Sequence, residues 1–135
     1  LEELAQSYGL LNRKVFFYGM VAPEEVLRLM EKSDFFVLNS NFETFSVTTA
    51  ESLICGKPVV VTRCGGPEEL VDETCGILID PKNTASLQKA MDYMLDMSRS
   101  YPCQRIQRSF QNRFSSESIG SQFNDIYKDI LKRKK

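Results

Sequence analysis

The sequence predicts an open α/β fold, in which a parallel β-sheet carries helices on both faces. Several short runs of aromatic and β-branched residues are apolar throughout, as is typical of strands buried on both faces of a parallel sheet. Helix-like segments lie between these runs, and this strand–helix alternation favours a parallel sheet. The last third of the chain contains helical patterns only. We therefore expect the sheet in the first two thirds and covering helices after it.

The first elements follow one another closely. A helix-like segment begins at Leu1, and the first predicted strand is Val15–Tyr18. The helix Pro23–Lys32 opens with a proline and two glutamates, which is a helix start signal. The apolar run Phe35–Leu38 is the second predicted strand.

The middle of the chain contains two further strands. The helix Val47–Cys55 can close at Gly56, and the proline that opens the strand Pro58–Thr62 prevents its continuation. The short helix Pro67–Val71 precedes the fourth strand, Gly76–Ile79.

Three helices complete the chain. Asn83–Met97 has its apolar residues on one side, Cys103–Asn112 follows, and Ser116–Lys132 is the last, with Ser116 as a candidate cap. The sequence contains no internal repeat and no interdomain linker, so we expect residues 1–135 to belong to one domain.

Composition excludes several classes of function. The chain has 135 residues, of which 42% are hydrophobic and 26% charged, and this balance is typical of a globular domain. The net charge of −1 provides no field for nucleic acid. Its four cysteines form no C-x-x-C pair and it has no histidine, so no metal site is expected and Ser–His or Cys–His nucleophiles are excluded. Unpaired cysteines of this kind favour a cytoplasmic protein with reduced thiols.

The segment after the second predicted strand carries the candidate chemistry. Ligands of open parallel sheets bind where strands end and loops lead into helices. Here the next helix begins near Phe45 or Ser46, and its first turn offers free N–H groups and a positive dipole end to a diphosphate. Glu43 and Glu51 lie on either side of that helix start. Because carboxylates repel phosphate, we expect them to bind hydroxyl groups on both sides of it.

The spacing of these residues resembles a known family signature. The pattern is Ser-x-x-Glu-x-Phe, a second Glu six positions after the Phe, and Gly-x-Pro-Val-Val beginning five positions after that Glu. The matching residues are Ser40, Glu43, Phe45, Glu51, Gly56, Pro58, Val59 and Val60. Further matches are Gly65-Gly66-Pro67-Glu68-Glu69, Gly76-Ile77-Leu78-Ile79, Asp80-Pro81, Val15-Phe16-Phe17-Tyr18-Gly19, Phe114-Ser115 and Tyr127. The sequence is thus similar to the GT4-type, or group 1, retaining glycosyltransferases over nearly its whole length.

The resemblance implies the Rossmann-like, C-terminal donor-binding domain of a two-domain GT-B fold. It implies that Glu43 contacts the donor sugar as the catalytic residue and that Glu51 binds the ribose hydroxyls. Backbone amides near Phe45, Ser46 and Val47 would reach the phosphates or the sugar. The turn Gly19-Met20-Val21 would pack against the nucleotide base. The parent enzyme would transfer sugar from a nucleotide-diphosphate sugar, with retention and without a metal, in polysaccharide or glycoconjugate biosynthesis.

Two departures from the family pattern bear on this interpretation. The family often has glycine where this chain has Ser46, and serine there demands either negative φ or local strain. The family's phosphate-neutralising Arg and Lys, and its acceptor-binding domain, belong upstream. We therefore expect this chain to be a partial domain that is inactive alone, with the acceptor glycan or lipid-linked glycan bound by the absent domain.

Alternative interpretations remain open from the residues alone. Glu43 and Glu51 could be a solvated loop acid and an exposed helix acid, or less plausibly a glycosidase pair. The Gly65-Gly66-Pro67 loop suits a plain tight turn as well as a cleft loop. A nucleotide-sugar epimerase or hydrolase of the same fold, and a non-catalytic sugar-nucleotide-binding remnant, are the competing functions. The basic tail Lys132–Lys135 suits a frayed helix end better than weak association with the inner membrane face.

Overall fold

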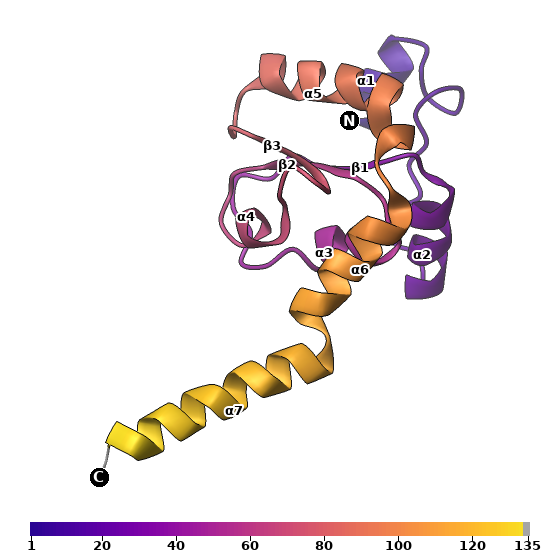
Figure 1. The fold of residues 1–135 in the computed structure, drawn as a ribbon. Coiled ribbons are helices and arrows are strands. Elements are labelled where there is room, and N and C mark those ends of the chain that lie inside the picture. Colours follow the sequence, from indigo (N-terminus) through magenta and orange to yellow (C-terminus); the bar gives the residue numbers. More distant parts are fainter. Residues whose placement is uncertain (134–135) are drawn as a thin grey trace.

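The structure is a computed structural model that describes residues 1–133. Figure 1 shows its elements in order along the chain. They are α1 (Glu2–Ser7), α2 (Pro23–Lys32), β1 (Phe36–Leu38), α3 (Val47–Ile54), β2 (Val59–Thr62), α4 (Pro67–Leu70), β3 (Gly76–Ile79), α5 (Thr84–Met97), the 3₁₀ helix η1 (Ser98–Ser100), α6 (Cys103–Phe114) and α7 (Ser116–Arg133).

The three strands form one parallel sheet in the order β1-β2-β3. Val37 pairs with Val60, and Val60 pairs with Ile77, so the carboxyl ends of all three strands meet at one edge. Every residue of the central strand β2 is buried. Three of the four continuous apolar runs were therefore correctly interpreted as strands of a parallel sheet.

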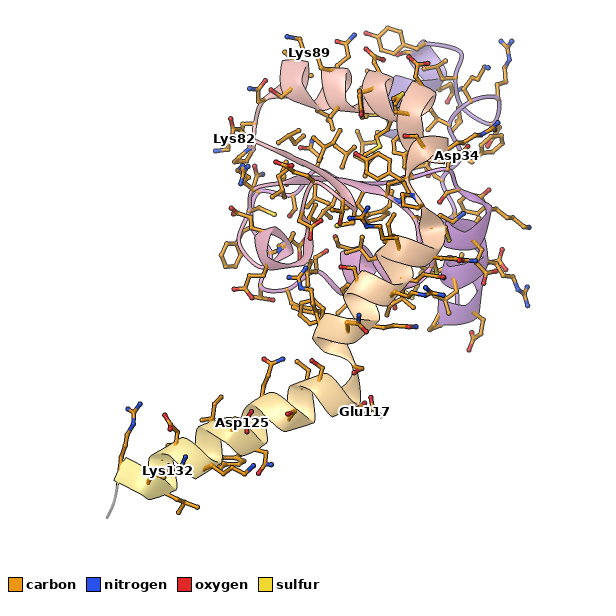
Figure 2. All side chains as sticks on the ribbon, in the orientation of Figure 1. Asp34, Lys82, Lys89, Glu117, Asp125 and Lys132 are labelled. Carbon is orange, nitrogen blue, oxygen red and sulfur yellow. The ribbon has the colours of Figure 1, made fainter. Side chains whose placement is uncertain are left out.

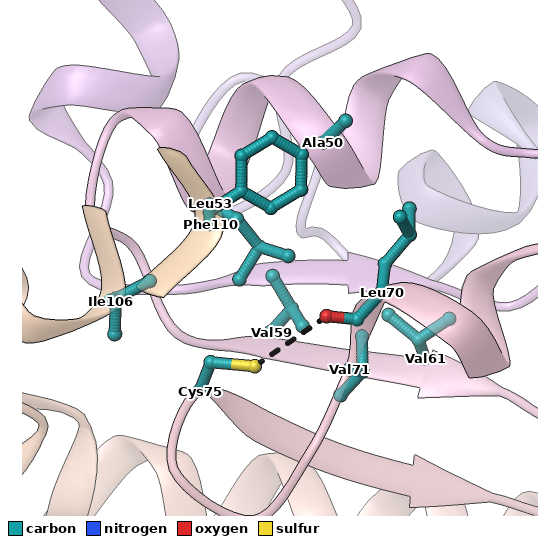
Figure 3. Packing of buried hydrophobic residues seen from close by; sticks show 9 residues of the cluster. All are labelled: Ala50, Leu53, Val59, Val61, Leu70, Val71, Cys75, Ile106 and Phe110. Atoms are coloured by element: carbon teal, nitrogen blue, oxygen red, sulfur yellow. Dashed lines mark hydrogen bonds between the residues drawn. The ribbon is translucent and has the colours of Figure 1, made fainter. Parts of the chain in front are cut away.

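Helices cover both faces of this sheet, as the sequence predicted (Figure 1). Val59 and Val61 point to one face, where they pack in a cluster with residues of α3, α4 and α6 (Figure 3). Val60 points to the other face, where it packs with Ala90 and Met94 of α5. Because successive side chains of a strand point to opposite faces, the three valines of β2 contribute to the cores on both sides of the sheet.

The prediction of a strand at Val15–Tyr18 is wrong. Val15 makes only an isolated bridge to Leu11, and the three aromatic residues after it are exposed by 56%, 41% and 59%. The pattern is apolar enough for a strand, but a strand also needs a neighbour with free backbone groups. Within residues 1–133 the sheet pairs β1, β2 and β3 alone, so this segment stays irregular.

The last helix, α7, departs from the body of the molecule, whereas α6 packs in the core. The helix α6 continues two residues beyond the predicted end at Asn112, and Ser115 rather than Ser116 caps α7, because its Oγ accepts a hydrogen bond from the Ser118 N–H at 3.2 Å. None of the residues of α7 is buried, and Figures 1 and 2 show it projecting away from the sheet.

The predicted basic tail lies only partly within the described residues. Lys132 and Arg133 lie in the last turn of α7, while Lys134 and Lys135 fall outside the described residues. Of the helices in the described part, none is long and apolar enough to cross a bilayer.

Candidate functional site

The exit from β1 is tied to the end of β2 through one hydroxyl group. The Thr62 side chain accepts a hydrogen bond from the Ser40 N–H at 3.0 Å and donates one to the Ser40 carbonyl at 2.6 Å. Thr62 is fully buried, so water does not compete for these bonds. The loop that follows β1 therefore starts from a fixed point at the carboxyl edge of the sheet.

Glu43 is held a few residues further along the same loop. Its N–H donates to the Cys64 carbonyl at 2.8 Å, and its own carbonyl accepts from the Gly66 N–H at 2.9 Å. Glu43 and Gly65 thus form an isolated parallel bridge that prolongs the sheet edge. The structure confirms that Glu43 lies in the loop after β1 and brings it beside the Gly65-Gly66 turn.

Both glycines of that turn allow a close approach of main chains. A Cβ at Gly66 would lie 2.2 Å from the Thr44 carbonyl oxygen and 2.4 Å from the Phe45 Cα. Gly65 has φ of +109°, and a Cβ there would lie 2.6 Å from the Glu43 carbonyl oxygen. The Gly65-Gly66 segment is therefore a tight turn, and it also packs directly against the loop that carries Glu43.

Helix α3 begins at Ser46 with unusual backbone geometry. Ser46 has φ of 67° and ψ of 82°. The sequence left open whether this serine adopts a negative φ or a strained backbone, and the structure shows the strained backbone. Its hydroxyl makes no cap bond to the first turn and instead lies 2.8 Å from the Thr49 hydroxyl, with both side chains buried. The first-turn N–H groups of α3 therefore carry no side-chain cap, and the helix start faces the Glu43 loop with its positive dipole end.

The remaining predicted residues are distributed over and beyond this region. Phe45 is 41% exposed, Val47 is more exposed still, and Glu51 is half-buried on α3. The second glutamate therefore lies on the helix that Glu43 precedes, as predicted. That both carboxylates border one concave surface stays a prediction.

The turn predicted to pack against a base lies in the irregular segment before α2. Gly19 has φ of +63° with open space around it, Met20 is fully exposed and Val21 is half-buried. Among residues 1–133, no hydrogen bond ties this turn to the Glu43 loop, so its role in binding a base stays a prediction.

A cavity of about 770 Å³ lies elsewhere, along β3. Arg63, Tyr93 and Tyr101 are among its lining residues, and neither Glu43 nor Glu51 is. We place the candidate site at the start of α3, because free helix N–H groups and carboxylates are the groups that bind phosphate and hydroxyls.

Sequence reasoning missed one residue that shapes the site. Thr62 ends an otherwise aliphatic strand, and this polar, β-branched residue in a buried run was the available signal. Its two bonds to the Ser40 backbone only become apparent when β1 and β2 are placed side by side.

Comparison with known proteins shows which protein family this chain resembles. The family described as Glycosyl transferases group 1 matches residues 1–112. An uncharacterized glycosyltransferase of Methanocaldococcus jannaschii is 30% identical over 95% of this chain and 33% of its own length. The N-acetyl-alpha-D-glucosaminyl L-malate synthase of Bacillus anthracis is 32% identical over 90% of this chain and 32% of its own. An O-antigen biosynthesis glycosyltransferase of Escherichia coli, WclY, is 27% identical over 90% of this chain and 33% of its own length.

Solved structures agree in fold. Sucrose-phosphate synthase from Thermosynechococcus elongatus superposes with a TM-score of 0.80 at 25% identity, over 98% of this chain and 34% of that one. Anabaena HepE, in complex with UDP, superposes with a TM-score of 0.79 at 25% identity, over 94% and 35%. The structure of HepE with UDP-glucose gives a TM-score of 0.76. These are GT-B glycosyltransferases, and the α/β fold described above is a Rossmann-like part of that architecture.

This chain spans about a third of the length of the curated relatives it matches. The family match covers most of the chain and includes β1, α3, β2 and the loops that carry Glu43 and Gly66. The chain therefore belongs to the group 1 glycosyl transferases.

Proposed function

We propose that this chain is the donor-binding part of an enzyme that transfers a sugar from a nucleotide-diphosphate sugar to an acceptor with retention of configuration. The observation that carries the proposal is the start of α3, where uncapped N–H groups meet a loop pinned to the Gly65-Gly66 turn. The UDP and UDP-glucose complexes of HepE support the nature of the ligand.

Each predicted residue has a chemical task in this proposal. The first turn of α3 binds the diphosphate through N–H groups and the helix dipole. Glu43, which precedes the helix, binds the transferring sugar, and Glu51, further along it, binds the ribose hydroxyls. Main-chain groups at Phe45, Ser46 and Val47 hold the region between them. The strained backbone of Ser46 fits such a task, because strained residues cluster where a ligand must be approached closely.

The rest of the enzyme is supplied outside these residues. We propose that the acceptor, a glycan or lipid-linked glycan, binds to another domain of the protein, and that this chain alone does not catalyse transfer. The O-antigen relative supports a place in polysaccharide or glycoconjugate biosynthesis. Binding without a metal, a cytoplasmic location and weak association with a membrane surface belong to the same proposal.

A donor screen tests this proposal. The full-length protein that carries this chain is mixed with UDP-, GDP- and ADP-sugars, and its thermal unfolding is followed. One nucleotide class is expected to raise the midpoint, since a ligand that binds only the folded state stabilises it by about 2.7 kcal/mol at 100 times its Kd. Glu51→Gln should reduce that shift, while the matched control Glu117→Gln, on the projecting α7, should not. Absence of any shift with all three classes, confirmed by calorimetry, would refute donor binding.

Product analysis separates the competing functions. Incubation with the donor that binds, with and without a glycan acceptor, yields a glycoside in the proposed enzyme. An epimerase yields an isomeric nucleotide sugar and a hydrolase yields free sugar without any acceptor. A non-catalytic remnant of the family binds the donor and leaves it unchanged.

A further inference from the structure

An aromatic side chain of α6 supports the loop that carries Glu43. The rings of Phe45 and Phe114 meet edge to face, with their centroids 6.3 Å apart and their planes at 74°. Phe114 in turn stacks on Phe110 at 4.7 Å, and Phe110 is buried in the core between the sheet and α6. The exposed ring of Phe45 is thus connected to the rigid core through one half-buried ring.

The residue before Phe114 holds a second wall of the candidate site. The Arg113 guanidinium donates to the carbonyls of Glu69 and Leu70, which close helix α4, and lies 4.0 Å from the Asp72 carboxylate. The same guanidinium stands over the Phe114 ring, 4.9 Å from its centroid. Arg113 therefore couples the aromatic stack to α4, the short helix that follows the Gly65-Gly66 turn.

These contacts join two loops that are far apart in the sequence. The Glu43–Ser46 loop and the Gly65-Gly66 turn already share main-chain hydrogen bonds. In the last turn of α6, Phe114 contacts the Glu43–Ser46 loop through Phe45. Arg113 contacts α4, the helix that follows the Gly65-Gly66 turn. Both residues lie just beyond residue 112, where the family match ends.

We propose that Phe114, assisted by Arg113, is a positioning residue that sets the Glu43–Ser46 loop against the start of α3. The inference rests on the proposed donor site and concerns how that site is held. Phe114 does not touch the donor. It fixes Phe45, and through Phe45 it fixes the main chain between Glu43 and Ser46. A loop that is strained at Ser46 needs such external support, because its own backbone geometry is unfavourable.

The test compares variants of the full-length protein that carries this chain. Phe114→Ala is expected to weaken UDP-glucose binding by about 2- to 10-fold, the range that corresponds to loss of one aromatic pair. It should also lower kcat, since a displaced loop misplaces the sugar, and leave the acceptor KM unchanged. Phe114→Tyr keeps the ring and should restore most of both. Arg113→Met should give a smaller loss of donor affinity.

Hydrogen exchange provides a readout that needs no ligand. In Phe114→Ala, the amides of Glu43 and Gly66 should exchange faster, while those of β2 keep their rates. The matched control is Ile106→Ala, which removes a fully buried side chain of the same helix without touching the loop. It should raise exchange across β2 and α3 together and leave the donor Kd unchanged at temperatures where the protein is folded.

The results of these experiments distinguish failure of the positioning role of Phe114 from failure of the proposed function. Equal donor affinity and equal exchange in Phe114→Ala and wild type overturn the positioning role. An equal loss of affinity in Ile106→Ala also overturns it, since the effect would then be one of global stability. If the wild-type protein binds neither UDP-glucose nor another nucleotide sugar, the proposed function fails instead. The positioning role is then judged by exchange alone, and unchanged rates at Glu43 and Gly66 overturn it.

Discussion

At the scale of single residues, the candidate site depends on main-chain geometry more than on rare side chains. Ser46 has a left-handed backbone, and Gly65 and Gly66 leave room for the loop that carries Glu43. The buried Thr62 side chain holds the start of that loop with two hydrogen bonds to the Ser40 backbone. Changes at these positions should therefore alter the site without altering its charged groups.

Replacing Gly66 by alanine tests this dependence. The new Cβ would lie 2.2 Å from a main-chain oxygen, so the two loops must separate. We expect unfolding to become easier by roughly 1–3 kcal/mol, the usual cost of an overpacked site, and donor binding to weaken. Gly120→Ala is the matched control, because nothing lies within 4 Å of its Cβ on α7. Denaturant unfolding of both variants gives the comparison, and equal stability of Gly66→Ala and wild type would contradict the structure.

The two glutamates should differ in kinetics. Glu43→Gln is expected to lower kcat, because charge develops on the transferring sugar and an interaction that strengthens in the transition state is lost. Glu51→Gln should mainly raise the donor KM, by a factor that corresponds to about 1.5–3 kcal/mol for a hydrogen bond to a charged group. Steady-state kinetics of the full-length enzyme with varied donor measures both. A larger kcat effect at Glu51 would reverse the assignment.

At the scale of elements, local signals and a partner surface act together. The helix α5 has both, since the Asn83 side chain accepts a hydrogen bond from the Ser86 N–H at 3.0 Å and Ala90 and Met94 pack on the sheet. The segment Val15–Tyr18 has the signal of a strand but no neighbour, and it stays irregular. A strand pattern therefore becomes a strand only where a second strand pairs with it.

The cap of α5 allows a test at this scale. Asn83→Ala leaves the first-turn N–H groups without that acceptor and should lower the free energy of unfolding by about 1 kcal/mol. Asn83→Asp keeps an acceptor and should cost much less. Thermal or urea unfolding of the two variants checks the difference. An alanine variant as stable as the aspartate variant would show that the hydrogen bond contributes nothing.

At the scale of the whole molecule, a layered body is followed by a helix that projects from it (Figure 1). The helix α7 carries a stripe of exposed apolar side chains at helical spacing, namely Phe123, Ile126, Tyr127 and Ile130. Further exposed aromatic side chains lie before α2, at Phe16, Phe17 and Tyr18. Exposed apolar surface of this extent favours association.

The chain expressed alone should therefore be less stable than the same residues within a longer protein. We expect it to self-associate as its concentration rises, and sedimentation velocity measures this directly. Replacing Phe123 and Ile130 by serine should reduce association, because both lie on the apolar stripe. Asn124→Ser, a change to a residue that is already polar, is the matched control. A monomeric wild-type chain with a sharp unfolding transition would contradict this expectation.

The sequence alone determined the fold class, three of the four predicted strands, and the positions of Glu43 and Glu51 relative to α3. These features follow from local patterns, because continuous apolar runs, proline starts and glycine ends act over a few residues. Only the tertiary structure decided that Val15–Tyr18 is not a strand, that Ser46 is left-handed, and that Gly66 meets Thr44 and Phe45. It also decided that the ring of Phe114 meets the ring of Phe45, 69 positions earlier in the sequence. Such contacts depend on which elements become neighbours in the folded chain, and no short-range pattern encodes that.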